Sequence, residues 1–210
     1  GSVANFQRGF DRINVPSVLT TLVTDELDFP NLSMVGVDDR AAAYTAVDYL
    51  IRQGHRKIAV LGGPVTSYPS LMRRQGAQQA MEDAGIVFND KLYGLSNYDF
   101  ESAYHAMNSL LARRAEFTAL FAMSDVIAFG AIRALVSAGL RVPEDVSVIG
   151  FDGITMSRYC VPVMTTIVQP SEQIALQSIE LLVRQIEHGS PAQTVTLQPE
   201  LQQGESVRAI

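Results

Sequence analysis

Residues 145–170 read DVSVIGFDGITMSRYCVPVMTTIVQP, and this stretch decides the fold. Its first part, residues 146–151, is apolar, rich in β-branched side chains and without an alternating polar face, which predicts a strand buried on both sides. The run stops at Asp152-Gly153, a turn signal that carries a carboxylate. A second apolar run, at residues 164–168, ends at Gln169-Pro170 before a helical pattern. Strands with polar ends, joined by a loop without helical period, predict a crossover between two halves of the molecule.

Upstream of this stretch, apolar runs and amphipathic segments alternate at regular intervals. The predicted strands are residues 57–61, 92–98, 118–123 and 146–151. The predicted helices run from a cap at Asp39 to Gln53, from residue 71 to 84, from a cap at Asp99 to Arg114, and from the Ser124-Asp125 pair to Ala138. This repeat has the spacing of right-handed parallel crossovers, which predicts an α/β fold with a doubly wound parallel sheet.

The two ends of the chain are less regular. They hold a weak helical pattern at residues 3–12, short strand patterns at 18–23, 34–37 and 194–197, and an amphipathic helical pattern at 171–187. By helical spacing, the side chains of that last helix that we expect to face inward are Ile179, Leu182, Val183 and Ile186.

The composition excludes several classes of protein. With 210 residues, 47% of them hydrophobic, the chain can bury one core or two small lobes. The net charge of -6 and the lack of a Lys/Arg cluster argue against nucleic-acid binding by this chain alone. A single cysteine, Cys160, excludes an internal disulfide and fits a reducing compartment. No apolar run reaches membrane-spanning length and no signal-peptide pattern begins the chain, so we expect a cytoplasmic protein without a membrane contact.

Polar side chains follow the carboxyl ends of the predicted strands, where open α/β sheets bind their ligands. They are Arg73, Tyr98, Ser124, Asp125, Asp152 and Gln169. Carboxylates and a guanidinium form paired hydrogen bonds with neighbouring hydroxyls, and an aromatic ring covers the apolar face of a sugar. The set therefore suits a small polyhydroxylated ligand.

Each of these residues also has a structural interpretation. Asp125, like Asp99, precedes a helix, so capping is favoured over ligand contact. Arg73, placed at a helix start, could form a surface ion pair, and Tyr98 could cover the edge of the lobe. Gln169 could satisfy the backbone at a helix start. Asp152 is the strongest candidate, because no clear helix follows Gly153 that would need a cap.

Motifs for cofactors and catalysis are missing from the sequence. The Gly62-Gly63-Pro64 loop lacks the Lys-Ser/Thr of a phosphate-binding loop, and no strand is followed by Gly-x-Gly-x-x-Gly. No metal-ligand spacing links His55, His105 and His188, which are expected to lie in solvent at helix ends. Cys160 has no base beside it. We therefore expect no cofactor, no metal and no enzymatic activity.

Four segments carry a family resemblance. They are VDYLIRQGHRKIAVLGGP (47–64), RRQGAQQAMEDAGI (73–86), TALFAMSDVIAFGAIRALVSAGLRVPEDVSVIGFDG (118–153) and YCVPVMTTIVQP (159–170). In order and spacing they closely resemble the LacI/GalR family of bacterial transcriptional regulators, over almost the whole chain. The resemblance implies a periplasmic-binding-protein-like (type I) fold, in which three crossovers join two α/β lobes that hold a ligand between them.

The resemblance also implies site residues. The family's ligand positions fall on Arg73, Tyr98, Ser124, Asp125, Asp152 and Gln169, with Tyr98 at the aromatic stacking position. Thr21 falls where sugar-binding relatives often have Asp. Ser124 replaces a common Asn, and Gly153 a common Asp or Asn, so a simple hexose preference does not follow.

The lobes implied by the family are unequal in this chain. Residues 38–167 with 195–210 correspond to a C-terminal lobe, and residues 1–37 with 168–194 to part of an N-terminal lobe. The family's DNA-binding headpiece and the first strands of its N-terminal lobe have no counterpart here. We therefore expect the smaller lobe to lack sheet partners, and to be poorly ordered, repacked or completed by another chain.

Three functions from different classes are weighed. The leading hypothesis is a module that binds a small polar effector, expected to be a sugar, in a LacI-type regulator. Such a regulator would be a homodimer and would contact operator DNA only through the missing headpiece. The alternative is a sugar-binding transport receptor of the periplasmic type. A flavodoxin-like enzyme ranks last, because the sequence offers no catalytic pair.

Overall fold

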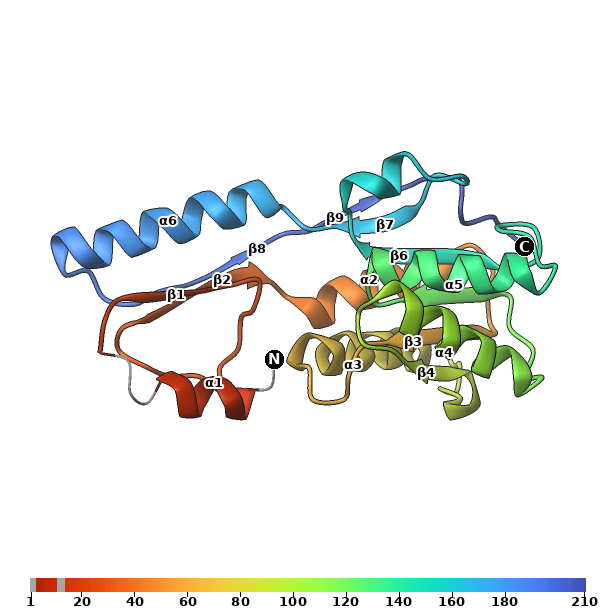
Figure 1. Ribbon diagram of the computed structural model, residues 1–210, viewed down its shortest axis with the longest axis horizontal. Helices are drawn as coiled ribbons and strands as arrows, with labels where there is room; N and C mark the ends of the chain where they lie inside the picture. The colour runs from red at the N-terminus through yellow and green to blue at the C-terminus, as the bar shows by residue number, and fades with distance from the viewer. Residues whose placement is uncertain (1–2, 11–13) are drawn as a thin grey trace.

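The computed structural model describes residues 3–10 and 14–210 of the chain. In this part of the chain two sheets lie end to end along the long axis of the molecule, each covered by helices (Figure 1). The larger sheet contains the middle of the sequence, and the smaller sheet combines segments from near both ends. The expected α/β class with a mostly parallel sheet is confirmed.

The larger sheet has the strand order β4-β3-β5-β6-β7-β9. Its strands are β3 (Ile58–Gly62), β4 (Tyr93–Leu95), β5 (Ala119–Ala122), β6 (Ser147–Asp152), β7 (Thr165–Val168) and β9 (Glu200–Gln202). All neighbours are parallel except β7 and β9. The central strands β3 and β5 are buried along their full length, which explains why they read as continuous apolar runs.

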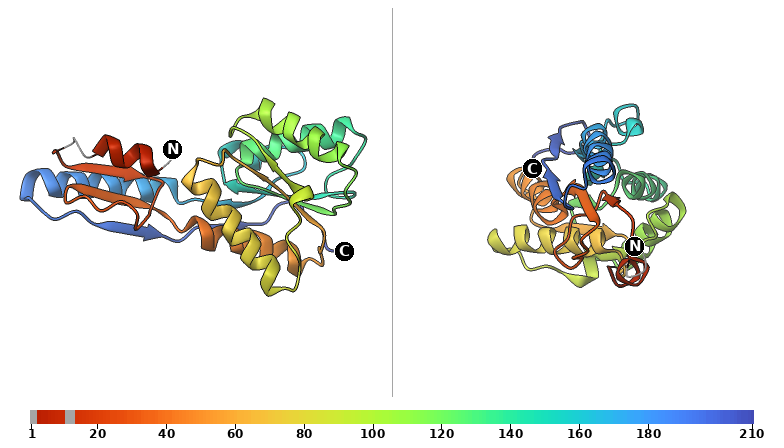
Figure 2. Two further views of the ribbon diagram at one scale, coloured as in Figure 1. Left: turned by 90° about the horizontal axis from the view of Figure 1, so that it is seen from below. Right: turned by 90° about the vertical axis from the view of Figure 1, so that its left-hand side faces the viewer.

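Helices cover both faces of the larger sheet (Figure 2). They are α2 (Asp39–Arg52), α3 (Tyr68–Asp83), α4 (Phe100–Ala112) and α5 (Asp125–Ser137). The pair α2 and α3 packs on one face and the pair α4 and α5 on the other. Short 3-10 helices, η1 (Asp90–Leu92) and η2 (Thr155–Arg158), precede β4 and follow β6. The helical spacing of α5 predicts that Ile127, Ala131, Ala134 and Leu135 face inward, and all four are buried.

The smaller sheet corrects an expectation. It has the order β1-β2-β8, all parallel, and consists of β1 (Ser17–Thr20), β2 (Leu32–Val37) and β8 (Thr194–Leu197). Helix α1 (Val3–Phe10) packs on the side of Leu32 and Met34, and helix α6 (Ser171–His188) on the side of Val35 and Val37. The expectation that β1 and β2 would lack sheet partners was wrong, because β8 returns from the end of the chain to pair with β2.

The position of β8 also bears on the predicted lobes. Residues 195–197 were placed with the larger lobe, but they belong to β8 and pair with the smaller sheet. The chain reaches the larger sheet only with β9, after Leu197. Within the described residues, the chain passes between the sheets after Val37, after Val168 and after Leu197 (Figure 1). The family resemblance implies crossovers near residues 36–38, 166–169 and 194–199, which lie at or beside these three points.

The buried face of α6 was predicted wrongly. Of the four residues predicted to face inward, Leu182 is half-buried, while Ile179, Val183 and Ile186 are 62%, 41% and 63% exposed. The residues that face the small sheet are Ile174, Ser178, Leu181 and Gln185. Ser33 of β2 is buried and donates a 3.0 Å hydrogen bond to Gln185 Oε1, so the sheet presents a polar group to the helix. Since apolar residues occur on both faces of α6, hydrophobic period alone could not identify the inner one.

The predicted solvent exposure was also wrong for one of the three histidines. His55 is only 1% exposed, and its ring nitrogens lie 2.9 Å from Thr118 Oγ1 and 3.1 Å from the carbonyl oxygen of Arg208. It ties the turn after α2 to the start of β5 and to the chain's end, which runs along the larger sheet. His105 and His188 are exposed, as expected.

Candidate functional site

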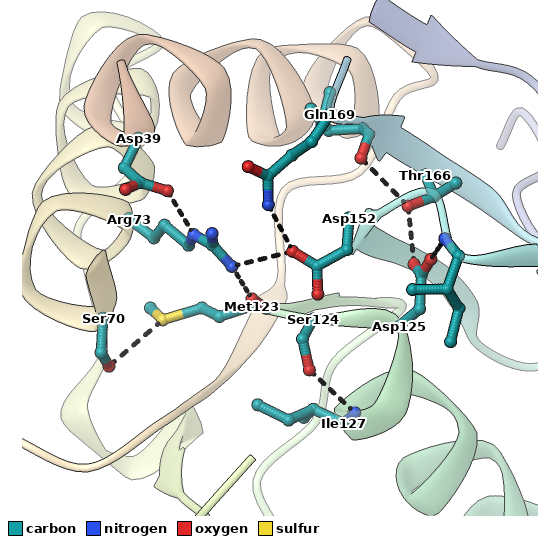
Figure 3. A network of polar contacts seen from close by, with 12 residues as sticks. Asp39, Ser70, Arg73, Met123, Ser124, Asp125, Ile127, Asp152, Thr166 and Gln169 are labelled. Carbon is teal, nitrogen blue, oxygen red and sulfur yellow. Dashed lines mark hydrogen bonds and ion pairs between the residues drawn. The ribbon is translucent and has the colours of Figure 1, made fainter. Parts of the chain in front are cut away.

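A buried arginine lies at the centre of the candidate site. Helix α3 begins at Tyr68, capped by Ser67, so Arg73 lies in its second turn rather than at the helix start that the sequence predicted. The guanidinium donates from Nε to Asp39 Oδ1 at 2.7 Å and from Nη1 to the carbonyl oxygen of Met123 (Figure 3). It also lies 3.7 Å from the centre of the Phe151 ring. Arg73 is only 6% exposed and has contacts on several sides. The alternative interpretation of Arg73 as part of a surface ion pair is therefore wrong.

Asp152 is the last residue of β6 and contacts Arg73. Its Oδ1 lies 3.5 Å from Arg73 Nη1 and accepts a 2.8 Å hydrogen bond from Gln169 Nε2 (Figure 3). The backbone N–H of Gln169 also donates to the carbonyl oxygen of Asp152, at 3.1 Å. Burial raises the pKa of Asp152, while Arg73 and Gln169 oppose this shift. The structure therefore brings Arg73, Asp152 and Gln169 together, as the sequence predicted.

Asp39 belongs to this cluster and was missed by sequence reasoning. It was assigned as the cap of α2, but Asp38 has that role and accepts from the N–H of Ala41 at 2.9 Å. Asp39 is the first helical residue, is 5% exposed and pairs with Arg73. Burial raises the pKa of Asp39, and Arg73 lowers it in part. The available signal was the Asp38-Asp39 pair itself, because only one of two adjacent carboxylates can occupy the cap position.

Asp125 and Ser124 lie beside the cluster but face inward. Ser124 is the cap of α5, and its hydroxyl accepts from the N–H of Ile127 at 3.2 Å. Asp125 is fully buried, and one of its oxygens accepts from Thr166 Oγ1 at 2.6 Å (Figure 3). The other oxygen accepts from the N–H of Ile154 at 2.8 Å. Of the two adjacent residues, Ser124 rather than Asp125 caps the helix. Burial raises the pKa of Asp125 to about 6.

Tyr98 and Thr21 lie outside the hydrogen-bonded cluster. The ring of Tyr98 packs against Gly63, where a Cβ atom would fall 1.9 Å from the ring. Gly63 is thus required by the close approach of the ring. Asp99 caps α4 by accepting from the N–H of Ser102, as the sequence predicted. Thr21 follows β1 and is exposed. The predicted ligand roles of Tyr98 and Thr21 stay predictions.

A cavity of about 240 Å³ lies between the two sheets. It is lined by Val23, Thr24, Asp25, Asp38, Asp39, Tyr68, Met72 and Thr196. Asp39 thus connects the cavity with Arg73, and the loop after β1 contributes Thr24 and Asp25 rather than Thr21. The surroundings are rich in hydrogen-bond acceptors, which suits a ligand with several hydroxyl donors. Within the described residues, no group of histidine, cysteine and carboxylate side chains is arranged to hold a metal ion.

Comparison with known proteins identifies the class of this arrangement. Residues 47–207 match the family described as "Periplasmic binding protein-like domain". The chain belongs to this family, and its relatives are transcriptional regulators of the LacI type. The resemblance stated from the sequence is confirmed. No helix among residues 3–10 and 14–210 has the length and apolar character needed to cross a bilayer.

Two curated relatives show how much of a regulator the chain covers. It is 37% identical to the HTH-type transcriptional regulator MalR of Clostridium butyricum, over 94% of this chain and 59% of MalR. It is 37% identical to the HTH-type transcriptional repressor CytR of Escherichia coli K12, over 82% of this chain and 50% of CytR. The chain therefore spans between half and three fifths of the length of these relatives.

Solved structures of transcriptional regulators also superpose on this chain. A complex of the transcriptional regulator CelR with cellobiose superposes with a TM-score of 0.88 at 30% identity, covering 98% of this chain and 63% of CelR. A LacI family regulator from Enterococcus faecium with bound ribose has a TM-score of 0.85 at 25% identity, covering 100% of this chain and 76% of that one. Both neighbours hold sugars.

Proposed function

We propose that this chain is the effector-binding module of a LacI-type transcriptional regulator, and that its effector is a small polar molecule with several hydroxyl groups, a sugar or a close relative. The observation that carries the proposal is the position of Arg73. Its guanidinium contacts Asp39, directly after one passage between the sheets, and Asp152, which is bonded to Gln169 directly after another. Asp39 also lines the cavity between the sheets, so a ligand there would contact this cluster through Asp39, beside the connections about which two lobes would move.

Binding would regulate the protein through its effect on the two lobes. A ligand shifts a conformational equilibrium only if it binds one state more tightly than the other. Hydroxyl groups that bridge Asp39 and Asp152 on one side and Asp25 or Thr196 on the other would favour a closed arrangement. The relatives' names support a regulator over a transport receptor or an enzyme, because they are transcriptional regulators.

Calorimetry tests the proposal. The chain is titrated with cellobiose, ribose and other neutral sugars, and we expect at least one to bind. Asp152→Ala should weaken that binding by about 1–3 kcal/mol, roughly 5- to 150-fold, because a charged hydrogen-bond partner is lost. Asp145→Ala is the matched control, since Asp145 pairs with Arg141 away from the cluster. Absence of binding by every sugar, or unchanged affinity in Asp152→Ala, would contradict the proposal.

The partners of the whole protein are part of the same proposal. We propose a cytoplasmic homodimer that contacts operator DNA through a segment outside this chain. The net charge of -6 supports the proposal that this chain does not itself contact DNA, because a chain that binds DNA by itself needs a basic surface. We expect no sequence-dependent gel shift with this chain alone, even at low salt. A tight, sequence-dependent shift would contradict the proposal that operator DNA is contacted only by a segment outside this chain.

A further inference from the structure

The turn that presents Asp152 has an unfavourable backbone conformation. Asp152 has a φ of 110° and Gly153 follows with a φ of 69°. An L-residue with a β-carbon rarely adopts the conformation of Asp152, and such residues persist only where the surrounding structure holds them. The direction of the Asp152 carboxylate therefore depends on whatever secures residues 152–154.

Asp125 supplies that support. Its Oδ2 accepts the N–H of Ile154 at 2.8 Å, directly after the turn. Its Oδ1 accepts the hydroxyl of Thr166 on the neighbouring strand β7 at 2.6 Å (Figure 3). One carboxylate thus joins helix α5, the turn and β7. Gly150 makes room for it, because a Cβ atom there would fall 2.2 Å from Asp125 Oδ1. The helix does not need Asp125 as a cap, since Ser124 has that role.

We propose that Asp125 is a positioning residue, whose carboxylate clamps the turn at residues 152–154 to β7 and thereby sets the direction in which Asp152 faces Arg73 and Gln169. Fully buried and bonded on both oxygens, Asp125 does not itself reach a ligand. This differs from the ligand role expected from the sequence. The inference deepens the proposed function, but its geometry can be tested without any ligand.

The charge of the clamp should respond to pH. The pKa of Asp125 is raised to about 6, chiefly by burial, and the neighbouring Asp152 carboxylate raises it further, while the bonds from Thr166 and Ile154 oppose the shift. The pKa of the Cys160 thiol is raised chiefly by burial, and the charge of Asp125 adds to this shift. Protonation converts an acceptor of two hydrogen bonds into a group that must donate one, which weakens the clamp.

Nuclear magnetic resonance of the labelled chain is the test. In the wild type, the amide signal of Ile154 should move with a midpoint near pH 6, because its hydrogen bond ends on Asp125. In Asp125→Asn this movement should vanish. The side-chain amide signal of Gln169, which is bonded to Asp152, should shift at every pH, and the signals of Asp152 and Gly153 should shift with it.

Two further variants decide between positioning and general stability. Ser124→Ala weakens the same helix without touching the turn, so the signals of Ile154 and Gln169 should stay in place even if the melting temperature falls. Thr166→Val removes one donor and keeps the carboxylate, and should raise the midpoint at Ile154. If Asp125→Asn does not fold, the wild type and Thr166→Val carry the test. Equal effects of Asp125→Asn and Ser124→Ala on the Gln169 signal would overturn the inference, as would a Thr166→Val variant in which the signals of both Ile154 and Gln169 stay in place.

Discussion

The two sheets of this molecule have apolar cores of different size. The larger sheet has helices on both faces and a core that includes the fully buried Phe121, Phe151 and Leu61. The smaller sheet is covered by α1 and α6 and has smaller apolar clusters, while α6 leaves large apolar side chains exposed on its outer face. The comparison shows that the polar cluster at Arg73 is anchored mainly in the larger sheet. The smaller sheet contributes groups around the cavity.

The largest expected effect is at the junction between the sheets. Arg73→Met removes the cation between Asp39 and Asp152 and leaves both carboxylates without their charged partner. We expect a loss of about 3–5 kcal/mol in the free energy of unfolding, the cost of breaking a buried ion pair from one side. Urea unfolding followed by circular dichroism measures it. The control Arg52→Met removes an exposed pair with Asp48 and should cost about 0–1 kcal/mol.

A matched pair of core truncations compares the sheets directly. Leu61→Ala opens a cavity in the fully buried core of the larger sheet, and we expect a cost of about 2–5 kcal/mol. Leu181→Ala on α6 removes the same atoms from the smaller cluster, where the site can relax more easily, and should fall at the lower end of that range. Equal losses in urea unfolding would show that the smaller sheet is packed as firmly as the larger one.

The stability of the larger sheet should also depend on His55. Burial lowers the pKa of His55, so the folded state binds a proton less readily than the unfolded state. Stability is therefore present above the ordinary histidine pKa and falls as the pH drops below about 6.5, by at most about 1.4 kcal/mol per pH unit. The difference between wild type and His55→Gln, measured by urea unfolding from pH 5 to 8, isolates this contribution from that of the buried carboxylates. A difference that does not change with pH would contradict it.

The smallest expected effect is on the outer face of α6. Ile179→Gln replaces a side chain that is 62% exposed, and surface changes of this kind stay within about 0.5 kcal/mol. Ile174→Gln, on the buried face of the same helix, is the matched comparison and should cost several times more. A large loss for Ile179→Gln alone would mean that its face is covered in solution, and sedimentation would then measure whether the chain associates.

Sequence reasoning was most accurate where burial is local and continuous. The strands β3, β5 and β6 and the inward residues of α5 were predicted because their apolar runs and periods have one interpretation. It was wrong for α6, whose buried face includes Ser178 and Gln185 and whose exposed face is apolar. Hydrophobic period shows which faces of a helix are apolar, but it does not show which of them packs against the sheet. In α6 the packed face is the one whose Gln185 bonds to Ser33 of the sheet.

Some residues of the candidate site could be identified from the sequence, and others could not. Asp152, Arg73 and Gln169 were identified because each follows or faces the carboxyl end of a strand, and the topology brings such ends together. Asp39 was missed because the sequence assigned it the cap role that in the structure belongs to its neighbour Asp38. Asp125 was expected near the site, but nothing local indicated that both of its oxygens would be used internally.

The sequence by itself determined the alternation of strands and helices, the class of fold and the family, because apolar period and segment motifs are local properties. The tertiary structure decided which carboxylate pairs with Arg73, which strand completes the smaller sheet and which face of α6 is buried. The physical reason is distance along the chain. Arg73 and Asp39 are 34 positions apart and Thr166 and Asp125 are 41, so only the folded chain brings their polar atoms within hydrogen-bonding range.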